Sequence, residues 1–230
     1  MAGKATPKKQ NNRANPITKK GKGGKPVKEK DPKDSHLYTD DNPETTLQGT
    51  GFKDATTANS TISLVSKRSL LYQWQTINTM YNRAKHHPKK TKDMEAAMAV
   101  FEKWLKETYP QQKADLRVFK PLQKKTVELF LPDLQKAKGV DTRFAELYVT
   151  LEPRKKLANV LVDDSKPGEL DWDRTRVEAL TALVPDKDNE VEESKLWEKD
   201  GMPSNYHLSL IAWAWSPLTE YKLLKGAKKG

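Results

Sequence analysis

Residues 70–88, LLYQWQTINTMYNRAKHHP, contain the clearest helical pattern in the chain. Leu70, Trp74, Ile77, Tyr81 and Ala84 recur every three or four residues, which places their side chains on one face of an α-helix. The helix should end before Pro88, because the residue that precedes a proline is disfavoured in the helical conformation. We therefore expect one helix here, with a single face turned to a hydrophobic core.

Shorter helical patterns flank this segment on both sides. Upstream, Asp54 is a suitable N-cap for a short helix that the stretch Lys67-Arg68-Ser69 interrupts. Downstream, Thr91 should cap a third helix that ends before Pro110. The expected inward-facing residues are Ala58, Ile62 and Val65 in the first helix and Met94, Ala97, Met98, Phe101, Trp104 and Leu105 in the third. The prediction is a mainly α protein with a three-helix unit over about residues 52–109.

Residues 114–226 predict a second helical lobe with a Trp-rich C-terminal segment. Pro121 and Pro132 should divide one helical stretch, Asp171 should cap a helix that Pro185 closes, and Ser216-Pro217 should begin the last helix. Residues 157–162 are short and β-branched enough to form a strand, and the pattern leaves that open. The apolar faces are expected at Val127, Phe130, Leu131, Leu134, Phe144, Leu147, Tyr148, Leu151, Val177, Leu180, Leu183, Leu208 and Ile211.

Residues 1–45 form a Lys-rich arm followed by a polar bridge. Up to residue 36 the arm contains eleven Lys or Arg against three Asp or Glu, which gives +8 of the formal net charge of +11. Such a segment cannot bury enough apolar surface to offset its chain entropy, so we expect it to be disordered when free. Residues 1–36 contain no Phe, Tyr or Trp, which favours phosphate contacts over base stacking. The alternatives are a solubilising tail, a nuclear-import signal or a role at a membrane surface. The predicted phosphate contacts are Lys4, Lys8, Lys9, Arg13, Lys19, Lys20, Lys22, Lys25 and Lys28.

A second basic cluster lies between the second and third predicted helices. It comprises Arg83, Lys85, His86, His87, Lys89, Lys90 and Lys92. Side chains on one turn can reach a phosphate together, and the start of the third helix would add backbone N–H groups. The two histidines would make such a site sensitive to pH. The alternative interpretation is an ordinary solvated, Lys-rich loop.

No pattern in the chain identifies an enzyme or a protein family. The carboxylates Asp163, Asp164, Glu169, Asp171 and Asp173 could in principle hold a catalytic metal ion, but they flank a plain turn and Asp171 already serves as a cap. The pair His86-His87 lacks the spacing of two ligands on one helix, and there is no Gly-rich phosphate loop on a strand. We expect no enzyme activity, no metal, no cofactor and no small-molecule substrate.

The aromatic residues divide into core and candidate interface. Trp74, Tyr81 and Trp104 lie on predicted buried stripes. Trp213 and Trp215 are two positions apart, so a helix could not turn both of them to the same core. One of the two is therefore a candidate for a protein–protein interface, because tryptophan is enriched there.

Compartment and partner follow from composition. The longest apolar run, residues 208–215, is far shorter than the roughly 20 residues that a membrane span needs. The absence of cysteine leaves the redox compartment undetermined. Because no secretory signal peptide is visible, we expect a protein of the cytoplasm, the nucleus or the inside of a virion, not a secreted one. The leading hypothesis is a non-catalytic protein that binds RNA or DNA largely without regard to sequence. One concrete version of it is a self-associating nucleocapsid or coat-type packaging protein. The alternative is a structural or adaptor protein that binds another protein.

Overall fold

The computed structural model describes residues 47–186 and 188–227, which belong to one compact unit, residues 42–230. The chain is mainly helical, as predicted, and the predicted basic arm lies outside the described residues. Within the described ranges there is no β-strand, only isolated bridges that join Leu161 to Asp171 and Trp197 to Pro203. The α-helices are α1 (Ala55–Val65), α2 (Leu70–Lys85), α3 (Lys92–Lys103), α4 (Tyr109–Asp115), α5 (Lys124–Lys136), α6 (Arg143–Thr150), α7 (Trp172–Leu183), α8 (Asn205–Ala212) and α9 (Glu220–Ala227).

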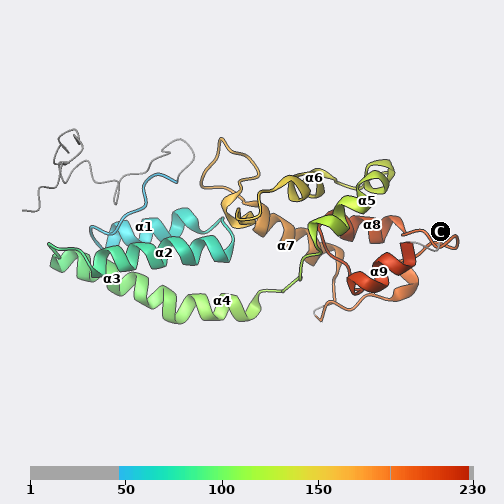
Figure 1. Cartoon of the computed structure of the whole chain (residues 1–230). Helices are drawn as coiled ribbons and strands as arrows, with labels where there is room; N and C mark the ends of the chain where they lie inside the picture. The colour runs from blue at the N-terminus through green and yellow to red at the C-terminus, as the bar shows by residue number, and fades with distance from the viewer. Residues whose placement is uncertain (1–46, 187, 228–230) are drawn as a thin grey trace, which may run out of the picture. The chain divides into compact units, whose positions relative to one another are not determined.

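The first three helices lie side by side and begin at side-chain caps (Figure 1). Asp54 accepts the Thr57 N–H at 2.7 Å, and Thr91 accepts the Met94 N–H at 3.2 Å, as predicted for these two caps. Ser69 caps α2. The apolar faces meet in a core that buries Ala58, Val65, Ile77, Ala97, Phe101 and Trp104. The first two predicted helices and the predicted start of the third are confirmed.

The third helix does not end before Pro110, and that prediction is wrong. A π-helical turn, η2 (Trp104–Thr108), follows α3 directly and leads into α4, where Pro110 occupies the first turn. Proline normally breaks a helix because its ring collides with the carbonyl four residues earlier. The wider π turn accommodates the ring, so the helical run continues to Asp115.

Pro132 does not divide a helix either, because it lies inside α5. Thr126, Val127, Phe130 and Leu134 are buried on the opposite side and hold the helix against the core. Pro132 itself is exposed, so the carbonyl that loses its helical hydrogen bond can bond to water. The energy of packing one face thus outweighs the local preference of proline.

The rest of the chain packs around two further apolar clusters. One joins α5, α6 and α8 through Val127, Phe130, Leu134, Phe144 and Ile211. The other contains Phe119, Leu180, Leu196, Leu210 and Trp215. Residues 157–162 form a short 3₁₀ turn, η3 (Leu157–Asn159), followed by the isolated bridge of Leu161. The division into a three-helix unit and a second lobe stays a prediction.

The last helix starts at Glu220, so the predicted start at Ser216-Pro217 is wrong. The Ser216 hydroxyl is within 2.9 Å of the Nε2 atom of His207 and accepts the Leu218 N–H at 3.2 Å. It therefore closes a turn and does not cap a helix. None of the described helices has both the length and the apolar character that crossing a membrane requires.

Candidate nucleic-acid interface

The basic turn, defined here as residues 83–92, connects the end of α2 to the start of α3. The side chains of Lys85, His86, Lys89, Lys90 and Lys92 are exposed, whereas Arg83 and His87 are partly buried. His87 fixes the conformation of the turn. The centroid of its ring lies 6.2 Å from that of the Phe52 ring, and its Nδ1 atom accepts a hydrogen bond from the Lys89 N–H at 3.2 Å. The structure thus brings the predicted cations of the folded part together on one connection.

Most of these cations form no ion pair with the rest of the chain that the structure describes. Among the described residues, none forms an ion pair with Arg83, Lys89, Lys90 or Lys92. The Lys85 ammonium lies 5.8 Å from the centroid of the Tyr81 ring. The sequence from 83 to 92 contains five Lys or Arg and no Asp or Glu. Positive charge is therefore available to an external anion on this turn.

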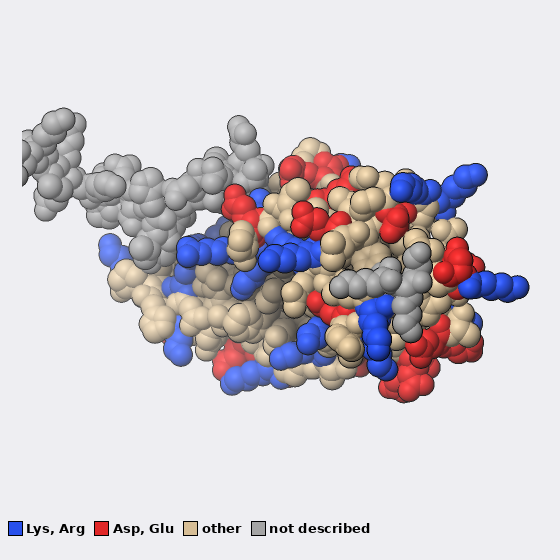
Figure 2. Space-filling model, turned by 45° about the vertical axis from the view of Figure 1, so that its right-hand side comes forward, with Lys and Arg blue, Asp and Glu red and all other residues tan. Residues whose placement is uncertain are grey.

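The wider charge distribution has the same sign. Residues 52–115 contain eleven Lys or Arg against six Asp or Glu, whereas residues 116–227 contain eighteen against nineteen. The helices around the basic turn are thus positive, and the second half of the chain is nearly neutral. Figure 2 shows that Lys and Arg lie interspersed with Asp and Glu on the face in view and do not form one continuous basic surface.

The start of α3 is a poorer anion site than the sequence suggested. Asp93 and Glu95 lie in the first turn of α3, where their carboxylates already interact favourably with the helix dipole. A phosphate at this position would meet two negative charges. The lysine side chains of the basic turn are therefore better candidates than the helix terminus.

A third group of cations escaped the sequence analysis. Arg154, Lys155 and Lys156 are consecutive and exposed between α6 and η3. The sequence signal that could have identified them is that three basic residues follow one another directly. They extend the set of positive side chains that the folded part offers to solvent.

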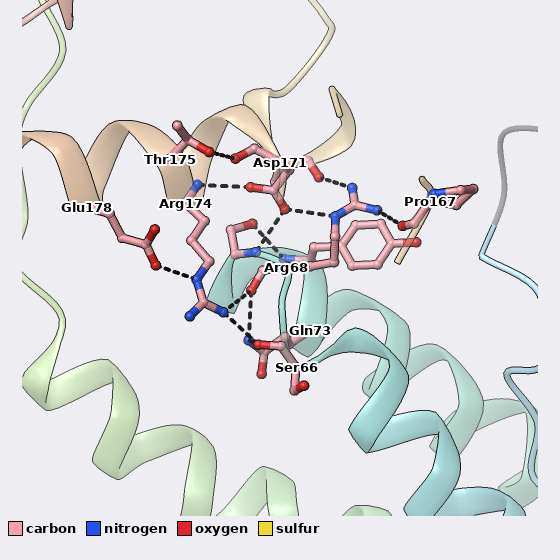
Figure 3. Close-up of polar contacts among 11 residues, drawn as sticks. Ser66, Arg68, Gln73, Pro167, Asp171, Arg174, Thr175 and Glu178 are labelled. Carbon is pink, nitrogen blue, oxygen red and sulfur yellow. Dashed lines mark hydrogen bonds and ion pairs between the residues drawn. The ribbon is translucent and has the colours of Figure 1, made fainter. Parts of the chain in front are cut away.

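The carboxylate of Asp171 is fully buried and has a structural role (Figure 3). Its Oδ2 atom accepts from Arg68 Nε at 3.1 Å and from the Ser69 N–H at 2.8 Å. Its Oδ1 atom accepts the Arg174 N–H at 2.9 Å, which is the predicted cap of α7. Arg68 also donates to the carbonyl oxygens of Pro167 and Ala158, both at 2.8 Å. All three guanidinium nitrogens of Arg68 are thereby used to join the start of α2 to the start of α7.

Two of the other acidic candidates, Asp163 and Glu169, have separate partners. Asp163 accepts from Ser165 and Lys166, and these hydrogen bonds lower its pKa to about 2. Glu169 pairs with Lys67 at 2.6 Å. In the described part of the chain, no group of three or more His, Asp or Glu is placed to hold a metal ion.

Buried His207 was not anticipated from the sequence. Its Nδ1 atom lies 3.1 Å from the Leu196 carbonyl oxygen, and its ring meets that of Trp197 edge-on at 5.2 Å. Burial lowers the pKa of His207 to about 4, although the hydrogen bond to Leu196 acts in the opposite direction. The residue holds the chain before α8 against the turn after it.

Trp213 and Trp215 lie in the packing of the chain itself. Helix α8 ends at Ala212 and Ala214 has a φ of 50°, so the helical geometry behind the predicted interface is wrong at this point. Trp215 is only 6% exposed and packs edge-on against Phe119 at 5.3 Å. Trp213 is partly buried with its ring 5.3 Å from that of Phe144.

Comparisons of the chain with protein-family models, with curated proteins and with solved structures find no match.

Proposed function

We propose that this protein binds the sugar–phosphate backbone of a nucleic acid without reading its sequence. The observation that carries the proposal is the basic turn, where five Lys or Arg stand without an acidic residue between them and four form no ion pair with any described residue. The arm, with a net charge of +8 over residues 1–36, supplies further positive charge of the same kind.

The expected chemistry is neutralisation of phosphates with release of their counterions. Residues 83–92 contain no Phe, Tyr or Trp, the large rings on which bases stack most strongly, and only the smaller imidazole rings of His86 and His87. Lysine ammonium groups act as point charges and do not select a base edge. Binding should therefore be similar for unrelated sequences and should weaken steeply as salt is added.

The test compares two triple variants of the full chain that lose the same charge. Lys89→Gln, Lys90→Gln and Lys92→Gln neutralise the basic turn, whereas Lys120→Gln, Lys136→Gln and Lys138→Gln neutralise three exposed lysines elsewhere. Affinity for duplex and single-stranded RNA and DNA is measured from about 50 to 300 mM salt. We expect the turn variant to lower the slope of log affinity against log salt by roughly two to three for duplex DNA, since each phosphate contact contributes about 0.9.

The control variant separates a local site from a general effect of net charge. It should change the slope much less than the turn variant. Equal losses in both variants would remove the basic turn as a site, and absence of binding at the lowest salt would reject nucleic-acid binding altogether.

The finer form of the proposal is a packaging protein of the nucleocapsid or coat type, made in the cytoplasm or nucleus or enclosed in a virion. Such a protein must self-associate as it covers nucleic acid. Light scattering should detect oligomers in the presence of nucleic acid. A monodisperse monomer both with and without nucleic acid would contradict this form.

A second candidate is a protein that binds another protein through its helical part. Val118, Leu129 and Tyr221 support it, since their side chains are 76%, 66% and 74% exposed. Isolated apolar residues are common on protein surfaces, so we rank this candidate second. Replacing all three by Ser should abolish partner binding under this hypothesis and leave nucleic-acid affinity unchanged.

A further inference from the structure

A cavity of about 560 Å³ lies among α2, the π turn η2, α4 and α7, away from the basic turn. Its volume is within the range of small-molecule sites, roughly 300–1,000 Å³. Leu70, Trp104 and Val177 are among its apolar lining residues. These walls favour a ligand with an apolar body.

The irregular turn η2 contributes directly to this cavity. Trp104 begins η2 and Thr108 ends it, and both residues line the cavity. Single π turns inside helices occur frequently at functional sites, because they place side chains where a regular helix would not. The π turn therefore supports a binding site at this place independently of the volume of the cavity.

One carboxylate in the cavity, that of Asp173, forms no ion pair with any described residue. Asp173 lines the cavity beside Ser69, whose hydroxyl donates a hydrogen bond to it. No Lys or Arg of the described residues lies within ion-pair distance of Asp173. Burial, followed by the like charge of Asp171, raises the pKa of this carboxyl group. The charge of Arg176 and the hydrogen bond from Ser69 lower this pKa, and the dipole of α7 favours a negative charge in its first turn, but none of these places a cation within ion-pair distance of the carboxylate.

The other charged groups of the lining are already engaged. Arg68 uses its guanidinium on Asp171 and two carbonyl oxygens. Arg174 donates to Glu178 at 2.7 Å and to the Ser66 carbonyl oxygen at 2.6 Å (Figure 3). Of the charged residues that line the cavity, Asp173 is thus the one that forms no ion pair with a described residue.

We propose that this cavity binds a small molecule with an apolar body and one protonated amine, and that the amine faces the carboxylate of Asp173. An ammonium group would place a positive charge and N–H donors directly against this carboxylate, which forms no ion pair within the described chain. This proposal does not depend on the proposed nucleic-acid binding, because the cavity lies away from the basic turn.

The first experiment uses the full chain and two probes of nearly the same shape. Calorimetric titration at pH 7 compares 1-naphthylmethylamine, which is a cation, with 1-naphthalenemethanol, which is neutral. We expect the amine to bind at least about tenfold more tightly, as a charge-assisted hydrogen bond implies. Equal affinity for the two probes, or no binding of the amine up to millimolar concentration, would overturn the proposal without any variant.

The second experiment removes the charge of Asp173 and keeps its shape. Asp173→Asn should weaken binding of the amine by about tenfold and leave binding of the alcohol unchanged. Asp164→Asn is the matched control, since Asp164 is exposed and does not line the cavity. The same amine affinity in both variants would reject the assigned role of Asp173.

Discussion

At the scale of single residues, Asp171 connects two parts of the chain that are far apart in sequence. Its carboxylate binds Arg68 and Ser69, which precede α2 by one or two residues, and it also caps α7. A buried charge persists only where it is paired and hydrogen-bonded. Arg68 is 3% exposed, so removing the carboxylate would leave a buried cation without its partner.

We therefore predict that Asp171→Ala lowers the free energy of unfolding by roughly 3–5 kcal/mol, the usual cost of breaking a buried ion pair from one side. Urea denaturation followed by circular dichroism measures this as a lower midpoint. Asp164→Ala is the control, because the Asp164 side chain is exposed, and a surface change of this kind should stay within about 0.5 kcal/mol. Similar midpoints for the two variants would show that the Asp171 carboxylate does not contribute this much to the free energy of unfolding.

The lowered pKa of His207 implies that the stability of the fold depends on pH. Its pKa is about 4 in the folded chain, against 6.5 for an unperturbed histidine, so the unfolded chain takes up this proton more readily. As pH falls from 6.5 towards 4, the free energy of unfolding should decrease by up to about 3 kcal/mol on account of this residue.

The variant His207→Gln cannot take up that proton. The difference in unfolding free energy between the original chain and the variant should therefore shrink by roughly 2–3 kcal/mol between pH 7 and pH 4.5. Urea denaturation at the two pH values measures it. A difference that stays constant would show that His207 does not titrate as its burial implies.

At the scale of elements, local signals predicted what local energies decide. Asp54, Thr91 and Asp171 cap their helices as the sequence indicated, because a capping side chain contacts a backbone N–H only three residues away. The cations of the basic turn could be grouped from the sequence for the same reason. Because these cations lie within ten residues of one another, their proximity in space does not depend on any long-range contact.

Irregular helical geometry and long-range packing decided the elements that the sequence did not predict. Pro110 and Pro132 lie in helices because an adjoining π turn and a buried face outweigh the proline penalty. The Arg68–Asp171 pair spans 103 residues, and no spacing pattern reports such a contact. The cavity beside Asp173 depends on that same long-range pairing and was equally invisible.

Pro132 gives a prediction at this scale. Pro132→Ala restores a donor to the interior of α5 without changing a buried side chain, since Pro132 is exposed. We expect the free energy of unfolding to rise by about 1–3 kcal/mol, because proline costs about 3 kcal/mol relative to alanine inside a helix. The midpoint of urea denaturation reports the change. A lower midpoint would mean that the proline fixes a geometry of α5 that the core requires.

At the scale of the whole molecule, charge is distributed unevenly along the chain. Residues 1–36 have a net charge of +8, and residues 52–115 add eleven Lys or Arg against six Asp or Glu. The remaining residues are close to neutral or acidic. A polyanion would therefore meet two positive segments, of which the first is the larger.

Deleting residues 1–36 should accordingly weaken nucleic-acid binding more than neutralising Lys89, Lys90 and Lys92 does, because it removes eleven cations and not three. The slope of log affinity against log salt should fall by more than about three on duplex DNA if at least four of those cations contact phosphates. An unchanged urea midpoint would confirm that the helical part is intact. If the shortened chain keeps the affinity and the salt slope of the full chain, the arm is not a phosphate-binding segment, and a role in solubility or nuclear import becomes the better explanation of its charge.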